Sequence, residues 1–520
     1  MSRKTVAKIL PVLLVAFTLL LSWIPEGHGS EKQEGVKHII LFIGDGMQLE
    51  HEIAASRYLY GMDRGLSFHK LAYQGFGTTW DIATYDRYAY AAGAPPYDEA
   101  GFHPNVGYDP SKGGGKPYPE QKSGIDDAYF LTRLPLPAGG PTKYPATDSA
   151  SAATAWATGI KTDDGNIAWA PGDPPDGALT TIAELLRESR GFSIGVVSTV
   201  PFSHATPAAH VSHNVHRNNY AEIAREIIRT VQPEVVIGAG YPGSVGGASA
   251  GFRYLSREDY EYLKADPSSP YVFVERQAGA DGALSLLEGA QRASEKGMKL
   301  FGLFGGPEGN FESPLAHDAP GAPLVTRATV ENPLLKDAVL AAFEVLSRNR
   351  DGFFVMIEQG DIDWANHAND FRRMIGTVRD LHEAVQSAID FIDRPGDGMD
   401  WSNTMLIVTS DHGNSFMRLH KEMKAGELPV QKGTCGYRQP PCTYPNGEVA
   451  YGSTDHTNEL VMVYAHGVFA TEGFKEKEGA WYPCTRIIDN TQLFHIMAEA
   501  AGVPRPSRLS PDVRRPAACE

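Results

Sequence analysis

Short apolar runs alternate with amphipathic stretches along most of the chain. Compact apolar runs bounded by turn residues are typical of buried strands, whereas apolar positions three or four apart are typical of helices. The expected strands cover residues 36–43, 193–200, 235–238, 299–304, 352–358 and 404–410, with a further apolar run at 460–464. The expected helices cover residues 50–60, 180–189, 220–231, 333–348 and 374–391. This alternation predicts an α/β fold with a mostly parallel central sheet and helices on both of its faces.

A block of small residues runs from Thr147 to Gly159. Alanine and serine at this density suit a helix that packs closely against its neighbours. Asp148 or Ser149 would lie at the N-terminus of that helix, where free N–H groups and the helix dipole favour an anion. A serine in this position can act as a nucleophile once it is activated. The alternative is that Asp148 or Ser149 only caps the helix.

Two stretches depart from the regular alternation. Between about residues 83 and 145 the sequence is rich in Gly, Pro and Tyr, and we expect a surface insertion with little regular structure. A second, loop-like insertion is expected at about 415–450, and the region 240–320 is Gly-rich and mixed in pattern. Such insertions shape access to a site or mediate contacts.

The first residues have the pattern of a secretory signal peptide. A basic start is followed by an apolar stretch at 9–21 and by the small residues Gly27 and Gly29. We therefore expect residues 1–29 to be removed and residues 30–520 to form an exported, periplasmic or secreted protein. The apolar run is shorter than the roughly 20 residues of a spanning helix, so stable membrane insertion is not expected, although an uncleaved anchor is the alternative.

The formal net charge is −16. Residues 1–29 hold three basic residues and one acid, so their removal brings the charge to about −18. This acidic balance argues against nucleic-acid binding, which requires a basic face. If the substrate is an anion, bound divalent cations are needed to reverse the local field.

The four cysteines favour disulfides, because the count is even and export is expected. Cys435 and Cys442 lie close together in a loop-like stretch, and we expect them to pair. The second expected pair is Cys484 with Cys519. The spacing of a zinc knuckle is absent.

Acidic and histidine side chains follow several of the expected strands. Asp45 follows the first strand, Glu358 ends the strand at 352–358, and Asp411 with His412 follows the strand at 404–410. Open α/β sheets place their sites at the carboxyl ends of parallel strands. Singly, each of these residues could also just shape a turn. Together they predict one site built from several strand ends.

Further metal-type ligands lie beside these strand ends. Asp363 and His367 are four residues apart, which places them on one face of a helix, and His456 precedes the last apolar run. Mixed Asp and His ligands suit zinc, whereas an all-oxygen set suits magnesium. Two metals about 3.5–4 Å apart can hold the attacking and leaving oxygens of a phosphoryl transfer.

More histidines follow the strand at 193–200. His204 begins the group, and His210, His213 and His216 continue it at a spacing of three. They could be metal ligands, but the spacing also fits one side of a solvated helix, which we favour for the last three.

Taken together, these motifs resemble those of the alkaline phosphatase family. They occur in the family's order between about residues 36 and 500. The matching stretches are 43–47, 148–159, 204–207 with Arg217, 358–367, 411–412 and 456–457. The resemblance implies an alkaline-phosphatase-like fold with surface insertions. It also implies an exported, metal-dependent phosphoric monoester hydrolase that releases inorganic phosphate.

The resemblance assigns a role to each residue. Ser149 would be the nucleophile that forms a phosphoserine intermediate, and Arg217 would bind two non-bridging phosphate oxygens. The implied cofactors are two Zn²⁺ and one Mg²⁺, and a homodimer is the implied assembly. The implied ligands are Asp45, Asp411 and His412 for one zinc, Asp363, His367 and His456 for the other, and Asp45, Thr206 and Glu358 for magnesium.

Two positions depart from the pattern of other family members. Some members carry Asp where this chain has His204, and others carry Lys or His where this chain has Trp364. Nitrogen ligands favour zinc or cobalt over magnesium, so the identity of the third metal is left open. Alternatively, His204 hydrogen-bonds a water molecule on a magnesium ion.

Three other functions fit parts of the pattern. A phosphodiesterase of the same superfamily is the alternative enzyme, although the Asp-Ser-Ala block and Arg217 argue for a monoesterase. A sulfatase is disfavoured because no Cys or Ser stands in a Cys/Ser-x-Pro-x-Arg setting. An extracytoplasmic phosphate- or metal-binding protein would need no nucleophile, and Ser149 is in place.

Overall fold

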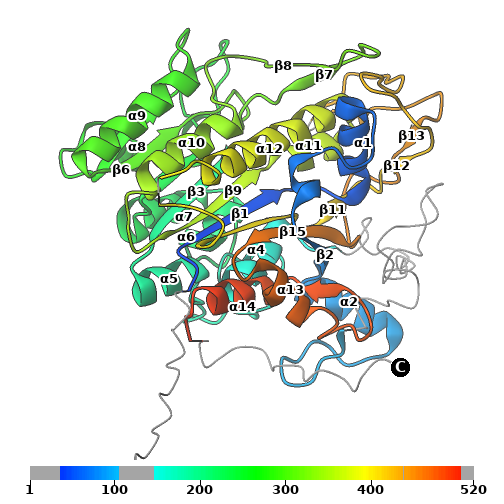
Figure 1. Ribbon diagram of the computed structural model, residues 1–520, viewed down its shortest axis with the longest axis horizontal. Coiled ribbons are helices and arrows are strands. Elements are labelled where there is room, and N and C mark those ends of the chain that lie inside the picture. Colours follow the sequence, from blue (N-terminus) through cyan, green and yellow to red (C-terminus); the bar gives the residue numbers. More distant parts are fainter. Residues whose placement is uncertain (1–34, 105–145, 397, 437–438, 505–520) are drawn as a thin grey trace, which may run out of the picture. The chain divides into compact units, whose positions relative to one another are not determined.

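A ten-stranded sheet lies at the centre of the computed structural model, which describes residues 35–104, 146–396, 398–436 and 439–504 (Figure 1). The strands follow the order β16-β2-β15-β10-β1-β9-β3-β4-β6-β5. Their bounds are β1 His38–Gly44, β2 Tyr73–Thr78, β3 Ser193–Pro201, β4 Val235–Ala239, β5 Tyr271–Glu275, β6 Lys299–Leu303, β9 Phe353–Gln359, β10 Thr404–Thr409, β15 Val461–Gly467 and β16 Ile487–Asp489.

Most neighbouring strands of this sheet run parallel. Only β15 is antiparallel to its two neighbours, β10 and β2. The central strands are buried along their whole length and mostly apolar because both faces of the sheet are covered, as is usual for parallel sheets. The predicted fold class is therefore confirmed.

Helices cover both faces of the sheet (Figure 1). Successive side chains of a strand point to opposite faces, so Ile40 and Phe42 of β1 pack into one core while Ile39 and Leu41 pack into the other. The first core includes residues of α1, α9, α10 and α12, and the second includes residues of α4, α5, α6 and α14. Their bounds are α1 Leu49–Tyr60, α9 Gly282–Lys296, α10 Leu335–Leu346, α12 Phe371–Ile392, α4 Ser149–Thr158, α5 Ile182–Arg190, α6 Ala205–Val211 and α14 Thr491–Ala500.

The register of three adjacent central strands gathers the predicted ligands at one edge. In β1, Ile43 lies opposite both Glu358 of β9 and Thr409 of β10. All three strands are parallel, so the residues that follow them leave the sheet at the same edge. Asp45 and Asp411 each lie two residues beyond this register and therefore come together beside Glu358.

Several local predictions need correction. Residues 83–92, placed in an insertion with little regular structure, belong to α2 (Ile82–Ala92), a helix capped by the Asp81 side chain. Residues 105–145 of that insertion lie outside the described residues. The predicted helix 220–231 is α7 (Tyr220–Arg225) followed by a π-helical stretch, Glu226–Val231.

The glycine-rich region also holds more regular structure than its pattern indicated. It contains α8 (Arg257–Ala265), β5 and α9. The helix α13 (Ala470–Lys477) and the strand β2 likewise had no clear sequence signal. Within the loop insertion, β12 (Arg418–Leu419) and β13 (Val449–Ala450) pair in an antiparallel fashion.

The predicted disulfide between Cys435 and Cys442 is present, with their Cα atoms 5.2 Å apart. Cys519 lies outside the described residues, so its pairing with Cys484 stays a prediction. The predicted signal peptide at 1–29 also lies outside the described residues and stays a prediction. Within the part of the chain that the structure describes, no helix combines the length and the apolar character needed to cross a membrane.

Candidate active site

Ser149 is the first residue of α4, and Asp148 caps that helix. The Asp148 carboxylate accepts a hydrogen bond of 2.9 Å from the backbone N–H of Ser151. All ten residues of α4 are buried, because their small side chains let the helix pack closely against α6 and α14. Asp148 is therefore the cap, and Ser149 is presented at the helix N-terminus, while its role as nucleophile stays a prediction.

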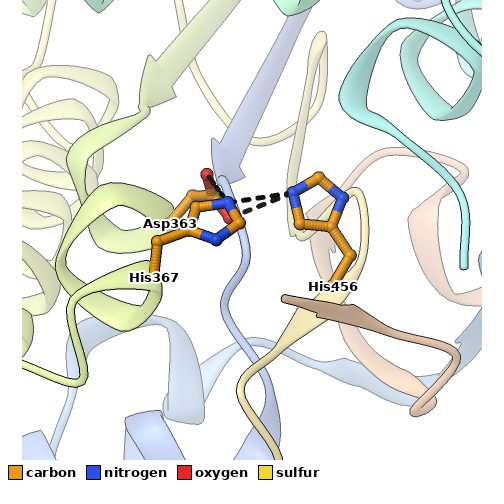
Figure 2. A group of neighbouring side chains, drawn as sticks. All are labelled: Asp363, His367 and His456. Atoms are coloured by element: carbon orange, nitrogen blue, oxygen red, sulfur yellow. Dashed lines mark hydrogen bonds and ion pairs between the residues drawn. The ribbon is translucent and has the colours of Figure 1, made fainter. Parts of the chain in front are cut away.

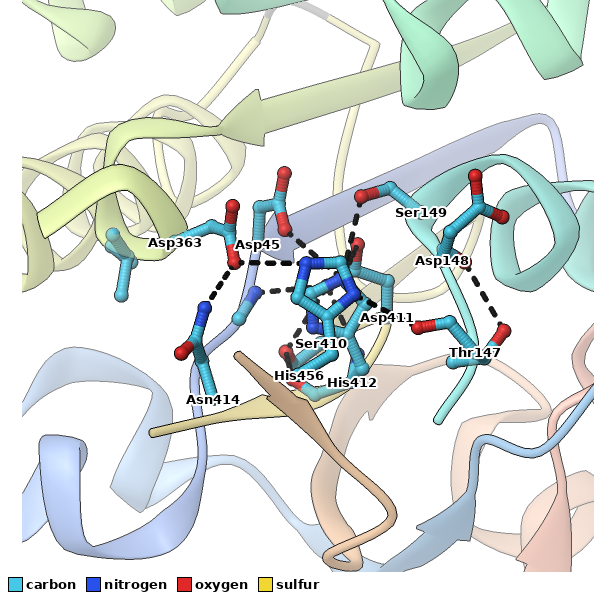
Figure 3. Close-up of polar contacts among 12 residues, drawn as sticks. Asp45, Thr147, Asp148, Ser149, Asp363, Ser410, Asp411, His412, Asn414 and His456 are labelled. Atoms are coloured by element: carbon cyan, nitrogen blue, oxygen red, sulfur yellow. Dashed lines mark hydrogen bonds and ion pairs between the residues drawn. The ribbon is translucent and has the colours of Figure 1, made fainter. Parts of the chain in front are cut away.

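A first group of metal-type ligands lies beside Ser149 (Figure 3). It consists of Asp45, Asp411 and His412, whose ligand atoms lie within 4.8 Å of one another. Nε2 of His412 is 3.2 Å from Oδ2 of Asp411 and 3.6 Å from Oδ1 of Asp45. The Ser149 hydroxyl oxygen is 3.3 Å from the same Nε2. The predicted nucleophile thus faces the predicted ligand group directly.

A second group of ligands combines a helix with a distant loop (Figure 2). The helix α11 (Asp361–His367) places Asp363 and His367 on one face, as their spacing predicted. Oδ2 of Asp363 is 3.1 Å from Nε2 of His367, and Oδ1 of Asp363 is 3.5 Å from Nε2 of His456. The rings of His412 and His456 stack with centroids 3.6 Å apart, which joins the two groups into one centre.

Backbone carbonyls fix the orientation of the three imidazoles. Nδ1 of His367 donates to the carbonyl oxygen of Thr454. In the same way, Nδ1 of His456 donates to the Thr147 carbonyl and Nδ1 of His412 to the Gly413 carbonyl. A carbonyl oxygen only accepts, so each Nδ1 carries a proton and each Nε2 faces the centre, where it can bind a metal ion.

Two of these Nε2 atoms face each other. Nε2 of His367 and Nε2 of His456 are 3.2 Å apart. With one proton of each ring held on Nδ1, two nitrogen lone pairs at this distance repel unless a proton or a metal ion lies between them. The tautomers set by the backbone therefore fit a bound metal ion.

Several buried oxygens in the same place also fit a cation. Among the described residues, the following atoms have no hydrogen-bond partner: Asp45 Oδ1, Asp411 Oδ2, Thr206 Oγ1 and Glu358 Oε1. Leaving such groups buried and unpaired costs about 1–3 kcal/mol each, more for charged ones. Beyond the effect of burial, the Glu358 carboxylate raises the pKa of Asp45 and the Thr206 side chain lowers that of Glu358, so the three ligands predicted for the third metal lie close together.

The pKa values reflect the same crowding. Burial raises the pKa of Asp45 well above its usual range, and the carboxylate of Asp411 raises it further. Burial raises the pKa of Glu358 to about 7 and lowers the pKa of His412 to about 4 and that of His456 to about 3. Without cations, burial disfavours the ionised form of these carboxyl groups and the protonated form of these imidazoles. A bound cation would stabilise the ionised carboxylates and would bind the neutral imidazoles.

His367 differs from the other two imidazoles. Burial alone would lower its pKa, but the Asp363 carboxylate raises the pKa to about 9. The partner carboxylate responds in the opposite sense, because His367 and His456 hold the pKa of Asp363 well below its usual range despite its burial. Asp363 is therefore the carboxylate of the centre whose pKa is lowered, whereas those of Asp45, Asp411 and Glu358 are raised.

Arg217 lies next to the predicted nucleophile through its partner Asp148. Nη1 of Arg217 donates to Oδ2 of Asp148 at 2.8 Å, and the Arg217 side chain is 18% exposed. Burial opposes a charge on either group, but Asp148 raises the pKa of Arg217 and Arg217 lowers that of Asp148. The pair holds the guanidinium beside the N-terminus of α4, where an anion would bind.

His204 precedes α6, and the other nearby histidines do not join it. Its ring lies 5.9 Å from the ring of Tyr220 and 6.4 Å from that of Trp364, and burial lowers its pKa to about 3. His213 instead pairs with Glu226 at 2.9 Å, and Nδ1 of His210 bonds the Thr206 carbonyl. The prediction that His210, His213 and His216 lie on one side of a solvated helix is wrong, because His210 is buried in α6, which ends at Val211, and the other two follow that helix.

Several positioning residues were missed by sequence reasoning. Asn414 donates to Oδ1 of Asp363 at 2.6 Å, and Ser410 donates to the His412 carbonyl at 2.9 Å (Figure 3). Both flank the Asp411-His412 pair in sequence, which is the one signal that could have identified them. Asp81 and Asp164 lie within 4.8 Å of Asp148 and had no such signal.

Comparisons with known proteins agree with this arrangement. The sequence model of the family described as alkaline phosphatase matches residues 118–236 and 287–428. Alkaline phosphatase H of Pseudomonas aeruginosa is 30% identical over 383 residues, which cover 68% of this chain and 73% of that protein. Alkaline phosphatase of Escherichia coli is 28% identical over 388 residues, which cover 69% of this chain and 74% of that protein.

A solved structure shares the fold. A His-to-Asp variant of the alkaline phosphatase from the Antarctic bacterium TAB5, with magnesium bound in its M3 site, matches with a TM-score of 0.55. The match covers 91% of this chain and all of that chain at 20% identity. On the strength of the family match and the Pseudomonas relative, this chain belongs to the alkaline phosphatase family and is a phosphoric monoester hydrolase.

Proposed function

We propose that the protein is a metal-dependent phosphatase that hydrolyses phosphate monoesters through a phosphoserine on Ser149. The observation that carries this proposal is the position of the Ser149 hydroxyl. It stands at a helix N-terminus, 3.3 Å from His412 and beside two groups of zinc-type ligands. Arg217 adds a guanidinium at the same helix end. A nucleophile, a cation site and an anion-binding fork together are what phosphoryl transfer requires.

The ligand sets suggest where the cations bind. One zinc ion would be held by Asp45, Asp411 and His412, and the second by Asp363, His367 and His456. Magnesium would be held by Asp45, Thr206 and Glu358, whose unpaired oxygens suit a hard cation. The magnesium in the M3 site of the TAB5 variant supports a third site in this fold. When bound, such ions supply positive charge that acidifies a nearby hydroxyl and neutralises the phosphoryl group.

The chain's own residues then carry out the displacement. The fork of Arg217 binds two non-bridging oxygens of the ester, a geometry that Lys cannot supply. Ser149 loses its proton and its oxygen attacks phosphorus, so a serine–phosphate bond forms while the bond to the alcohol oxygen breaks. The alcohol leaves after taking up a proton. Water then attacks the phosphoserine, which releases inorganic phosphate and restores the hydroxyl.

We also propose that the protein is exported and forms a homodimer. The signal-like residues 1–29 support export to a periplasmic or extracellular compartment, and the Cys435–Cys442 disulfide suits such an oxidising place. By resemblance to the family we also infer a homodimer. The acidic balance of the chain gives no support to nucleic-acid binding.

The first prediction concerns substrate and metal. The protein should hydrolyse p-nitrophenyl phosphate much faster than bis(p-nitrophenyl) phosphate, because a monoester has three non-bridging oxygens, two for Arg217 and one for the cation centre, whereas a diester has only two. A chelator should abolish this activity and zinc should restore it, with metal content followed by mass spectrometry. Full activity in metal-free protein, or faster turnover of the diester, would contradict the proposal.

The second prediction concerns the nucleophile. Ser149→Ala should abolish the phosphoenzyme and leave the metal content near normal, because the hydroxyl is not needed to gather the Asp and His ligands. Slow direct attack by water should survive, since the charge stabilisation remains. Ser151→Ala is the matched control and should still form the phosphoenzyme, which acid quenching with labelled substrate detects. Parent-like turnover by Ser149→Ala would mean that another hydroxyl is the nucleophile.

The third prediction concerns Arg217. Arg217→Ala should weaken inhibition by inorganic phosphate by about tenfold to a hundredfold, because a charge-assisted hydrogen bond contributes ~1.5–3 kcal/mol. Arg225→Ala removes an exposed ion pair with Glu258 and should leave phosphate inhibition unchanged. The measurement is the inhibition constant for phosphate, and equal constants in the two variants would refute the assignment.

The fourth prediction concerns His204. A carboxylate in its place would add negative charge near Asp45, Thr206 and Glu358, and this favours magnesium over zinc. His204→Asp should therefore need added magnesium for full activity and should respond to it more steeply than the parent protein. Titration of both proteins with magnesium at fixed zinc measures this, and identical activation curves would show that His204 does not govern the third site.

A further inference from the structure

A cavity of about 440 Å³ lies beside the metal-type centre. Its walls come from the loop 306–313, from α11 and the start of α12, and from the disulfide-closed loop, which contributes Gly436 and Gln439. A volume of this size accommodates a small organic molecule such as a monosaccharide. No residue predicted to hold a metal or to attack phosphorus lines this cavity.

The helix α11 connects the cavity to the catalytic centre. Trp364 and Ala368 line the cavity, whereas Asp363 and His367 face the centre. Successive side chains of a helix differ by about 100° around its axis. The face of α11 that lines the cavity therefore adjoins the face that carries the predicted metal ligands. The ring of Trp364 also lies near His204, 6.4 Å between centroids. Trp364 is therefore the side chain that the cavity and the surroundings of the centre share, and the alcohol part of an ester whose phosphate lies at the centre would extend past its ring toward the cavity.

The lining has a buried acceptor without a partner. Asn310 is 7% exposed, and its Nδ2 donates to Oδ1 of Asp361 at 2.9 Å. Its Oδ1 atom has no hydrogen-bond partner among the described residues. Since the amide nitrogen is held by Asp361, the free oxygen selects a ligand that donates a hydrogen bond, such as a hydroxyl or an amine.

The lining also carries an excess of carboxylate. Glu308 forms no ion pair within the described ranges, whereas Glu312 is paired with Arg276 at 2.8 Å. The one guanidinium in the wall, that of Arg373, lies 3.6 Å from the carboxylate of Asp370. The exposed carboxylate of Glu308 therefore gives the cavity a negative field, which attracts a positively charged group.

We propose that this cavity binds the alcohol part of the substrate and selects polyhydroxylated alcohols that carry an amino group. Amino-sugar phosphates are then better substrates than neutral sugar phosphates, and sugar phosphates with an added carboxylate are the poorest. The proposal rests on the phosphomonoesterase function and names its substrate class. Hydrogen bonding to Asn310 selects the hydroxyls, and the charge of Glu308 selects the amine.

The test compares three esters of similar size that differ in charge. Glucosamine 6-phosphate, glucose 6-phosphate and 6-phosphogluconate are assayed for kcat/KM with the full-length, metal-loaded protein, and p-nitrophenyl phosphate is assayed beside them. The expected order of kcat/KM is amine, then neutral sugar, then acid. An exposed charge contributes up to about 1 kcal/mol, so neighbours in this order should differ by roughly threefold to fivefold.

Two variants assign the preference to the cavity. Glu308→Lys should remove or reverse the preference for the amine, while Glu295→Lys, an exposed change of equal charge on α9, should preserve it. Asn310→Leu should raise KM for both uncharged and amino sugars by about tenfold relative to p-nitrophenyl phosphate. If Asn310→Leu fails to fold, the Glu308 comparison alone decides.

The outcomes separate the two proposals. Turnover of p-nitrophenyl phosphate with equal kcat/KM for the three sugar esters would overturn the cavity proposal and leave the phosphatase function standing. A preference that Glu308→Lys and Glu295→Lys change equally would also overturn it, because long-range charge would then explain the order. Absence of any monoester turnover would overturn the phosphatase function and the cavity proposal with it.

Discussion

Buried negative charge at one edge of the sheet is the constraint on which the rest of this site depends. Strands β9, β1 and β10 are adjacent and parallel, so their register forces Glu358, Asp45 and Asp411 into one place. Burial raises the pKa of Asp45 and of Asp411, and the negative charge of neighbouring carboxylates raises both further. The apolar packing on both faces of the sheet holds these groups together against their repulsion. Bound cations are the compensation that fits both the carboxylates and the neutral imidazoles.

Hydrogen bonds within the folded chain orient the side chains of the site before any ligand binds. Three carbonyl oxygens set the tautomers of His367, His456 and His412, and Asn414 holds one oxygen of Asp363. The Asp148 cap positions both Ser149 and Arg217, so one carboxylate orients the nucleophile's helix and the anion-binding fork. Groups fixed in this way need little reorganisation when charge develops on the phosphoryl group, which is the basis of electrostatic catalysis.

The helix α11 lies between the metal-type centre and the cavity that we propose for the alcohol part of the substrate. The ligand face of α11 serves the metal-type centre, and its adjoining face forms a wall of the acidic cavity. A change at Glu308 or Asn310 can therefore alter the environment of the alcohol part without touching a predicted ligand. The Cys435–Cys442 disulfide closes the loop that completes this wall, which ties the predicted insertion to the neighbourhood of the site. The insertion would thus contribute to selectivity rather than to the reaction itself.

The sequence by itself determined the fold class, the central strands and the residue types of the site. Apolar runs and the four-residue spacing of Asp363 and His367 are local patterns, so they can be interpreted without knowledge of distant contacts. Composition misled at α2. The stretch around it is rich in Gly, Pro and Tyr, but residues 82–92 themselves include four alanines and begin at the cap Asp81, so they form a helix. Only the tertiary structure decided which groups meet, because strand order and register bring together residues such as Gly46 and Asp411, 365 positions apart. The carbonyls that orient the imidazoles and the unpaired oxygen of Asn310 likewise exist only in the folded chain, since backbone groups and cavities leave no trace in the order of side chains.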